Sequence, residues 1–352
     1  MRIGIYNPYL HSMSGGERYT MTLASHWSAN NHVSIFWDDE TIIRKLSDQF
    51  SLNCSHVEVH PNIFAKGKIW DKLFQTRKFD LLFFLSDGSV PLTFAPYNIL
   101  HFQIPFPHVA FPFWKSVRYQ SVVCNSLYTK NNIDPTVGTR AAVIYPPVDV
   151  EKFSNRVTKK HIILSVGRFT PYHQAKKQDV LIGAFRQARD KGLLQGWKLV
   201  FAGAMLSGDA QYILSLKSLA KGLPVEFLPN CSFAVLQQMY EQASIYWHAA
   251  GFGEEKPELM EHFGITTIEA MAAGCIPIVY KEGGPAEVIE DGVNGYLWGT
   301  YEELMDKTLM CLNDRELENT LKHAATARSK MFSKEIFCQS YDRLLERVTK
   351  RV

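Results

Sequence analysis

Short apolar runs alternate with segments of helical period along the whole chain, and this alternation restricts the possible folds most strongly. In the first half, we predict strands near residues 2–7, 33–38, 79–85, 97–103, 121–125 and 141–145. In the second half, we predict strands near residues 161–166, 197–203, 225–228, 245–248 and 276–280. Strands that alternate with helices predict an α/β fold with parallel sheets, because helical crossovers return the chain between parallel strands.

The length of the chain and two adjacent prolines predict two domains. A chain of 352 residues is long for one ordinary core, and Pro146-Pro147 followed by a polar stretch to Lys160 is typical of a linker. We therefore predict Rossmann-like domains over 1–155 and 156–332, and a C-terminal helix over 333–352 that begins at a cap-like Ser333. Ligands of open α/β sheets bind at the carboxyl ends of the strands, so we expect two such edges to face each other across a cleft.

Composition excludes several classes of protein. The chain is 46% hydrophobic and 21% charged, and its net charge of +3 gives no electrostatic case for binding nucleic acid. The six cysteines lack Cys-x-x-Cys or metal-ligand spacing and are expected to be reduced thiols. The start lacks a long apolar signal region, and no apolar run of about 18 residues occurs. We expect a cytoplasmic protein that is neither secreted by a classical signal nor membrane-spanning.

Residues 261–274 contain two glutamates at a predicted junction between a loop and a helix. Glu261 precedes Gly264, and Glu269 lies in a segment of helical apolar spacing that Gly274 is placed to end. The first turn of a helix has free N–H groups, and the positive end of the helix dipole attracts anions. We expect a phosphate to bind the backbone amides of Phe263, Gly264, Ile265 and Thr266. One bound molecule could touch both carboxylates.

A single helical glutamate is usually a solvated surface residue, so the spacing of the whole segment carries the assignment. The segment reads Glu261-His-Phe-Gly, Glu269-Ala-Met-Ala-Ala-Gly, a strand with Pro277, and Gly283-Gly-Pro-Ala-Glu287. It resembles the carboxylate-pair signature of the family-4 retaining glycosyltransferases, and the resemblance covers nearly the whole chain. It implies the two-domain GT-B fold, with Glu261 against a donor sugar and Glu269 on the ribose of the sugar nucleotide.

Three cations follow the first strand of the second half. Arg168 comes directly after the strand, and Lys176 and Lys177 follow a polar loop. They are either solvated charges or groups that neutralise a leaving diphosphate. The spacing is similar to the Gly-Arg…Lys element of the family, which aligns Lys176 with the family lysine and leaves Lys177 as an alternative. Lys177 stands where family members usually carry a glycine.

Two features of the first half have a structural and a functional interpretation. Gly15-Gly16 is either an ordinary tight turn or a ligand loop, and it lacks the Gly-x-Gly-x-x-Gly spacing of dinucleotide binders. A lone histidine in an apolar strand, such as His101, is more often a core residue than a catalytic one. The resemblance implies a glycine loop near the diphosphate and acceptor, and a histidine that contacts the donor sugar. We therefore include Gly15, Gly16 and His101 among the expected site residues.

The resulting prediction is a hexosyltransferase that uses a nucleoside diphosphate sugar, retains configuration and needs no metal or other cofactor. No Asp-x-Asp triplet occurs to hold a divalent ion against a diphosphate, so Arg168 and Lys176 would stabilise the leaving group. Within the family, the signature looks most like that of mannosyltransferases of lipid-linked oligosaccharide assembly. The alternatives are a sugar-nucleotide epimerase of the same fold and a non-catalytic sugar-nucleotide-binding protein.

Two apolar segments raise the question of membrane contact. Residues 63–79 carry a stripe of apolar residues surrounded by cations, and 102–114 form an aromatic, proline-rich segment. The stripe consists of Ile69, Trp70, Leu73 and Phe74, and the cations are Lys66, Lys68, Lys72, Arg77 and Lys78. The stripe either faces the protein core or docks peripherally at the inner face of an anionic membrane, near a glycan or lipid-linked acceptor.

Overall fold

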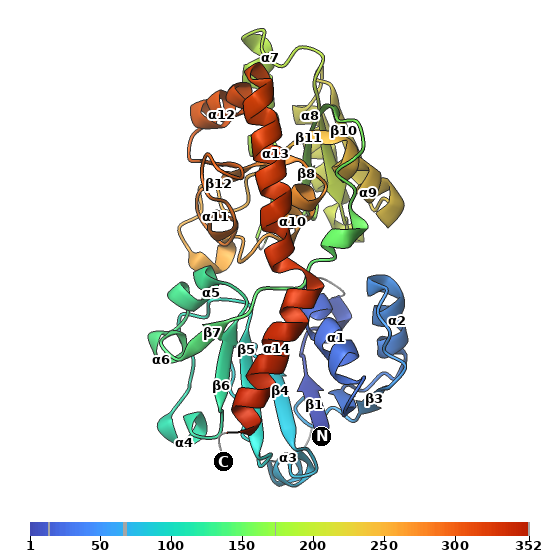
Figure 1. The fold of residues 1–352 in the computed structure, drawn as a ribbon, viewed down its shortest axis with the longest axis vertical. Helices are drawn as coiled ribbons and strands as arrows, with labels where there is room; N and C mark the ends of the chain where they lie inside the picture. The colour runs from blue at the N-terminus through green and yellow to red at the C-terminus, as the bar shows by residue number, and fades with distance from the viewer. Residues whose placement is uncertain (13–14, 66–68, 173, 351–352) are drawn as a thin grey trace. The chain divides into compact units, whose positions relative to one another are not determined.

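The computed structural model describes residues 1–12, 15–65, 69–172 and 174–350, and these form two compact units (Figure 1). Unit 1 comprises Met1–Pro147 and Lys334–Val352, and unit 2 comprises Val148–Ser333. The first division lies earlier than the expected position near 155, because the segment after Pro147 packs on unit 2. There, Val148 pairs with Ser333 in a β-bridge, and the Phe153 ring lies 5.3 Å from the Tyr240 ring.

Unit 1 contains a parallel sheet in the order β3-β2-β1-β4-β5-β6-β7. Its strands are β1 (Arg2–Tyr6), β2 (His32–Phe36), β3 (Val57–His60), β4 (Leu81–Leu85), β5 (Tyr97–Phe102), β6 (Ser121–Cys124) and β7 (Ala141–Val143). Its helices are α1 (Gly15–Trp27), α2 (Thr41–Phe50), α3 (Ile69–Thr76), α4 (Phe113–Ser116), α5 (Leu127–Asn132), α6 (Pro135–Gly138) and α14 (Lys334–Thr349).

Unit 2 contains a second parallel sheet in the order β10-β9-β8-β11-β12-β13. Its strands are β8 (Lys160–Val166), β9 (Lys198–Gly203), β10 (Val225–Pro229), β11 (Ala243–His248), β12 (Ile276–Tyr280) and β13 (Tyr296–Trp298). Its helices are α7 (Gln178–Asp190), α8 (Ala210–Leu219), α9 (Phe233–Gln242), α10 (Ile265–Ala272), α11 (Pro285–Val288), α12 (Tyr301–Asn313) and α13 (Arg315–Ser329).

The observed strands confirm the predicted α/β class, and each predicted strand has a counterpart in the described chain. Sequence analysis missed β3 and β13, which are short and lie at the edges of their sheets. An edge strand has only one neighbour and does not require the continuous apolar run by which central parallel strands are recognised. β4 shows the central pattern, since all five of its residues are buried.

The core of unit 1 lies on both faces of its sheet. Leu81 and Phe83 of β4 belong to the cluster beneath α1, α2 and α14, and Leu82 belongs to the cluster on the opposite face. α14 packs on α1, where the Tyr341 and Tyr19 hydroxyls lie 2.8 Å apart. None of the helices in the described ranges combines the length and apolarity that crossing a membrane requires.

Both sheets have the strand order of a doubly wound fold, and this order locates the positions where ligands bind. The order reverses between β1 and β4 in unit 1 and between β8 and β11 in unit 2. Crevices at such switch points, outside the carboxyl ends of the strands, are the usual ligand sites of open α/β sheets. The segments after β8 and β11 contain the predicted residues Arg168, Lys176 and Glu261.

Candidate functional site

Glycines position the loop before α10. Gly264 precedes the helix with φ 92°, in the left-handed region that favours glycine, and no side chain caps the helix start. A Cβ on Gly284 would lie 2.2 Å from the His262 carbonyl oxygen, so a second backbone segment approaches the loop closely. The Gly284 amide donates to the Glu261 carbonyl oxygen at 2.7 Å. The two glycine motifs therefore support one rigid loop in front of the helix.

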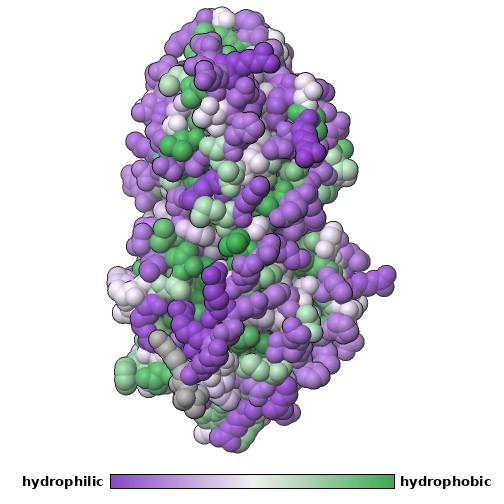
Figure 2. Space-filling view, in the orientation of Figure 1, coloured by the Kyte–Doolittle hydropathy of each residue, from purple (hydrophilic) through white to green (hydrophobic). Residues whose placement is uncertain are grey.

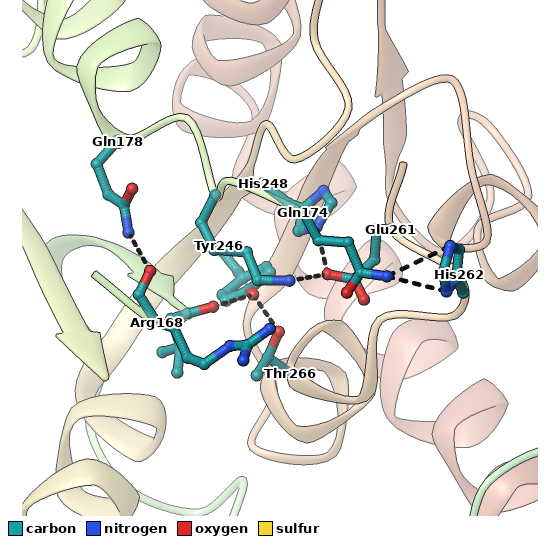
Figure 3. A network of polar contacts seen from close by, with 10 residues as sticks. Arg168, Gln174, Gln178, Tyr246, His248, Glu261, His262 and Thr266 are labelled. Atoms are coloured by element: carbon teal, nitrogen blue, oxygen red, sulfur yellow. Dashed lines mark hydrogen bonds and ion pairs between the residues drawn. The ribbon is translucent and has the colours of Figure 1, made fainter. Parts of the chain in front are cut away.

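Glu261, which is labelled in Figure 3, forms an ion pair with Lys176 at this loop. Each side chain is only 16% exposed. Burial alone would raise the pKa of Glu261, but the Lys176 ammonium and the nearby His248 hold it well below its usual range. Glu261 is therefore a carboxylate at neutral pH. It lies beside the Lys176 ammonium, so that one ligand can contact both charges.

His248 is a second neighbour of Glu261 that sequence analysis did not assign to the site. It ends β11, is almost fully buried, and places Nε2 at 3.7 Å from Glu261 Oε2. Burial lowers the pKa of His248, an effect that the Glu261 carboxylate opposes. A polar residue at the carboxyl end of a strand is the signal that could have identified it, as it identified Arg168.

The structure separates the two lysines that the sequence left as alternatives. Lys177 adopts a left-handed conformation with φ 53° at the start of α7. Its ammonium lies 2.6 Å from Glu254 Oε1, in the segment between β11 and Glu261. Lys176, one residue earlier, faces Glu261 instead. A left-handed residue at this position also explains why a glycine commonly occupies it.

Arg168 lies just beyond β8 with an exposed side chain (Figure 3). Its carbonyl oxygen accepts a hydrogen bond from Gln178 Nε2 at 3.0 Å, and Gln178 Oε1 in turn accepts from the Tyr212 hydroxyl at 3.0 Å. These bonds fix the backbone of Arg168 relative to α7. Among the described residues, no carboxylate lies within ion-pair distance of the guanidinium, so its charge is open to an anionic ligand.

Glu269 projects from α10 into a buried position, where its Oε2 accepts a hydrogen bond from the Tyr240 hydroxyl at 2.9 Å. The pKa of Tyr240 is raised well above its usual value, first by burial and then by the Glu269 carboxylate. Tyr246, the next tyrosine along the chain, donates to Thr266 Oγ1 at 2.8 Å. The charges of Glu261 and Glu269 both contribute to raising the pKa of Tyr246, after the larger effect of burial. The two carboxylates therefore flank one buried tyrosine.

His262 and Gln174 add a polar contact beside Glu261 (Figure 3). Gln174 Nε2 lies 3.0 Å from His262 Nδ1 and 3.3 Å from Nε2. Burial lowers the pKa of His262 to about 4. The contact joins the loop before α7 to the loop before α10, and no spacing in the sequence indicates that these two loops meet.

The remaining predicted residues of unit 2 lie around the start of α10. Phe263 is 3% exposed, and its ring centroid lies 5.7 Å from that of Phe332, so only its backbone can serve a ligand. Ile265 and Thr266 form the first turn of the helix. Among the described residues, no group of three or more His, Cys, Asp or Glu side chains has a metal-binding arrangement.

In unit 1, Gly15 and Gly16 form the first turn of α1, where the sequence indicated a loop before the helix. A Cβ on Gly16 would lie 2.5 Å from Gln103 Oε1, and Gln103 Nε2 donates to the Gly16 carbonyl oxygen at 3.4 Å. The glycine therefore allows the segment after β5 to approach the helix start. Ser14, next to this pair, lies outside the described residues.

His101 lies in the core of unit 1 and is 0% exposed. Its ring stacks on Tyr19 with centroids 4.2 Å apart, and Phe83 lies 5.6 Å away on a neighbouring strand. Burial lowers the pKa of His101 to about 3, so the imidazole is neutral. Among the described residues, neither ring nitrogen has a hydrogen-bond partner of good geometry. The expected contact between His101 and a donor sugar stays a prediction.

Comparison with known proteins assigns the chain to a family and a fold. Residues 149–328, a little over half of the chain, match the family described as "Glycosyl transferases group 1". A mouse (Mus musculus) relative, "GDP-Man:Man(3)GlcNAc(2)-PP-Dol alpha-1,2-mannosyltransferase", is 29% identical over 64% of this chain and 48% of its own length. The chain spans about half the length of the curated relatives it matches.

Two solved structures are similar along nearly the whole chain. The Anabaena protein HepE, in complex with UDP and glucose, has a TM-score of 0.71 and 18% identity, and the match covers 98% of this chain and 99% of HepE. Sucrose-phosphate synthase from Thermosynechococcus elongatus has a TM-score of 0.72 and 15% identity, with full coverage of both chains. At these identities the similarity shows the fold alone, and it agrees with the expected GT-B class.

Proposed function

The chain belongs to the group 1 glycosyltransferases, and from this premise we propose that it transfers a hexose from a nucleoside diphosphate sugar to an acceptor hydroxyl. The proposed reaction retains the anomeric configuration. Unit 2 binds the nucleotide sugar in this proposal, because the family match and the polar network around Glu261 both lie there. Unit 1 binds the acceptor.

The observation that carries the proposal is the charge arrangement at the start of α10. Glu261 is held as a carboxylate by Lys176, and an uncapped helix start follows directly. A sugar nucleotide complements both features, because its hydroxyls can donate to a carboxylate and its phosphates can bind helix amides and cations. In the proposed complex, Glu261 contacts the sugar and Glu269 the ribose.

The leaving diphosphate is stabilised by cations and amides in this proposal. Arg168 is exposed beyond β8, and Lys176 stands in the ion pair with Glu261, so an incoming phosphate would share or replace that pairing. The bond from the anomeric carbon to the phosphate oxygen breaks while the bond to the acceptor oxygen forms on the same face. The acceptor proton passes to the departing phosphate, so the reaction requires no carboxylate nucleophile and no co-reactant besides the donor and the acceptor.

We further propose GDP-mannose as the donor and a lipid-linked glycan as the acceptor. The support is the mannosyltransferase-like signature together with curated relatives named "GDP-Man:Man(3)GlcNAc(2)-PP-Dol alpha-1,2-mannosyltransferase" and "Alpha-1,3/1,6-mannosyltransferase alg-2". UDP-glucose is the competing donor, because HepE has been solved with it.

A donor screen tests the proposal. The melting temperature of the protein is measured with GDP, UDP, ADP and their sugars. Release of the nucleoside diphosphate is then measured with acceptor, without acceptor and in the presence of EDTA. We expect GDP-mannose to raise the melting temperature, since a ligand at a hundred times its Kd adds about 2.7 kcal/mol, and we expect activity to persist in EDTA. Stabilisation by UDP-sugars alone would overturn the donor assignment. Sugar isomerisation without transfer to an acceptor would show that the protein is an epimerase and not a transferase.

A further inference from the structure

An exposed aromatic and basic surface on unit 1 has no role in the proposed reaction. We call it the α3–α4 surface and define it by its apolar and its cationic members. The apolar members are Ile69, Trp70, Phe74, Phe113, Trp114 and Val117, and all are exposed. The cationic members are Lys72, Arg77, Lys78, Lys115 and Arg118. Lys66 and Lys68, predicted to belong to it, lie outside the described residues.

The structure decides between the two interpretations of the apolar stripe. An ordinary core-facing helix would bury the whole stripe, but Leu73, at 4% exposure, is the one member of the stripe that α3 buries. Trp70 remains 64% exposed and Phe74 58% exposed, while Phe113 on α4 reaches 82%. Single exposed apolar residues need no explanation, but several large ones on two adjacent segments indicate an interaction site.

Phe94 joins the two halves of the α3–α4 surface. Arg77 beside α3 lies 4.8 Å from the Phe94 ring, and Arg118 beside α4 lies 5.8 Å from the same ring. The Phe94 amide donates to Thr76 Oγ1 at 2.9 Å, which fixes this segment to the end of α3. The aromatic residues of the two helices therefore belong to one continuous surface.

Three cations of this surface donate to backbone carbonyls. Lys72 donates to the Phe64 carbonyl oxygen at 2.9 Å, Lys115 to that of Val90 at 2.8 Å, and Arg118 to that of Thr93 at 3.1 Å. Among the side chains that the structure describes, no carboxylate lies within ion-pair distance of any of the five cations. Their positive charge is therefore not neutralised by the described side chains and can attract an anionic surface.

The α3–α4 surface lies at the edge of the sheet where the strands begin (Figure 1). α3 leads into β4, whose preceding residue Asp80 accepts a hydrogen bond from the Tyr97 amide, and α4 leads into β6. In the view of Figure 2, hydrophobic side chains gather over α4 and at the end of unit 1 occupied by α3, with hydrophilic side chains between them. Binding at this edge leaves the carboxyl ends of the strands open for ligands.

We infer that the α3–α4 surface docks the protein on an anionic lipid bilayer. Tryptophan and phenylalanine place apolar rings below the headgroups, and lysine and arginine meet lipid phosphates, so mixed aromatic and basic surfaces suit a membrane interface. A protein partner fits less well, because the centre of a protein interface is depleted in charged side chains, whereas here Arg77 lies 5.6 Å from the Phe74 ring and Lys115 lies 5.5 Å from the Trp114 ring. Docking anchors the protein and is independent of the donor it uses.

Vesicle co-sedimentation of the full chain tests the inference. We expect binding to vesicles of mixed phosphatidylcholine and phosphatidylserine, little binding to phosphatidylcholine alone, and release at high salt. Phe113→Ala with Trp114→Ala should lower binding by about tenfold or more through lost apolar burial. Lys78→Gln should lower vesicle binding about fivefold, since one cation near an anionic membrane strengthens binding by about this factor. Leu214→Ala and Lys217→Gln on α8 are matched controls of similar exposure and should bind like the parent.

Several outcomes would overturn the docking inference. One is a protein that stays in the supernatant with anionic vesicles at low salt. Another is a loss of binding in the α8 controls equal to that in the α3–α4 variants. A third outcome is self-association without vesicle binding, measured by light scattering over a concentration series. If the Phe113 and Trp114 substitutions abolish this self-association, the surface is a contact between two copies of the chain. Thermal melts of each variant check that the fold is intact.

Discussion

The two units share one strand order but carry different chemistry at the carboxyl ends of their strands. In unit 2, His248 ends β11 and lies beside the Glu261–Lys176 pair. In unit 1, His101 lies near the end of β5 beside the Tyr19 and Phe83 rings, and no charged side chain among the described residues forms an ion pair with it. Both imidazoles are buried and have a lowered pKa, yet only one faces a charge. Burial of a histidine therefore does not identify a site; the groups around it do.

The same contrast separates the two adjacent lysines, and we expect the largest effect there. Lys176→Ala should reduce kcat/KM by about a hundredfold to a thousandfold, comparable to losing one preorganised donor to a developing negative charge. Lys177→Ala should change it less than about threefold, because its ammonium is engaged by Glu254 and not by Glu261. Steady-state kinetics with a saturating acceptor measure both. Equal losses in the two variants would contradict the assignment of Lys176.

The buried His101 should make unit 1 sensitive to acid. Its pKa is lowered to about 3, so the folded state binds fewer protons than the unfolded chain below about pH 6.5. The contribution of the neutral imidazole to the free energy of unfolding is complete above pH 6.5 and is lost as the pH falls towards 3. Between pH 7 and pH 4, the free energy of unfolding of His101→Phe should therefore fall by about 3 kcal/mol less than that of the parent.

Urea unfolding at the two pH values measures this difference, and the same variant tests a role for His101 in catalysis. Activity retained within severalfold at pH 7 would assign the ring, which is buried among aromatic residues, to the core alone. A hundredfold loss of kcat with unchanged stability would support contact with the donor sugar instead. Equal acid destabilisation in His101→Phe and in the parent would contradict the prediction.

A smaller effect should distinguish the two carboxylates. Glu269→Ala should weaken nucleotide binding by about 2 kcal/mol, the value typical of a hydrogen bond to a charged group. Tyr240→Phe, which removes only the hydroxyl that donates to Glu269, should cost about 1 kcal/mol of the same affinity. Glu261→Ala should leave nucleotide affinity nearly unchanged and lower kcat. Calorimetry with the nucleoside diphosphate decides the division, and equal affinity losses in Glu261→Ala and Glu269→Ala would refute it.

The sequence predicted the central strands better than the edges, and the charged motifs better than their partners. Continuous apolar runs identify β4 and β11, but the three-residue edge strand β13 is too short to show a period. Glu261 and Lys176 were both predicted, yet their pairing joins positions 85 residues apart. Such a pairing depends on the strand order, which local propensity does not encode.

The stripe on α3 shows the same limit. Its spacing allowed either burial or exposure, since both a core-facing and a membrane-facing helix need apolar residues on one side. Only the tertiary structure showed that Leu73 is buried while the rest of the stripe remains exposed to solvent. The position of Gly16 is a parallel case, because the sequence left a tight turn and a ligand loop as alternatives and the structure gives a contact with Gln103.

The sequence by itself determined the α/β class, most of the strands and the residue types of the site around α10, because apolar periodicity, glycine and charge act locally. Tertiary structure alone decided which groups face one another. It brought His248 to Glu261 and Tyr240 to Glu269, assigned Lys177 to Glu254, and buried His101 among aromatic rings. These outcomes depend on which strands lie side by side and on which neighbours exclude water, and both are set by the packing of segments distant in the chain.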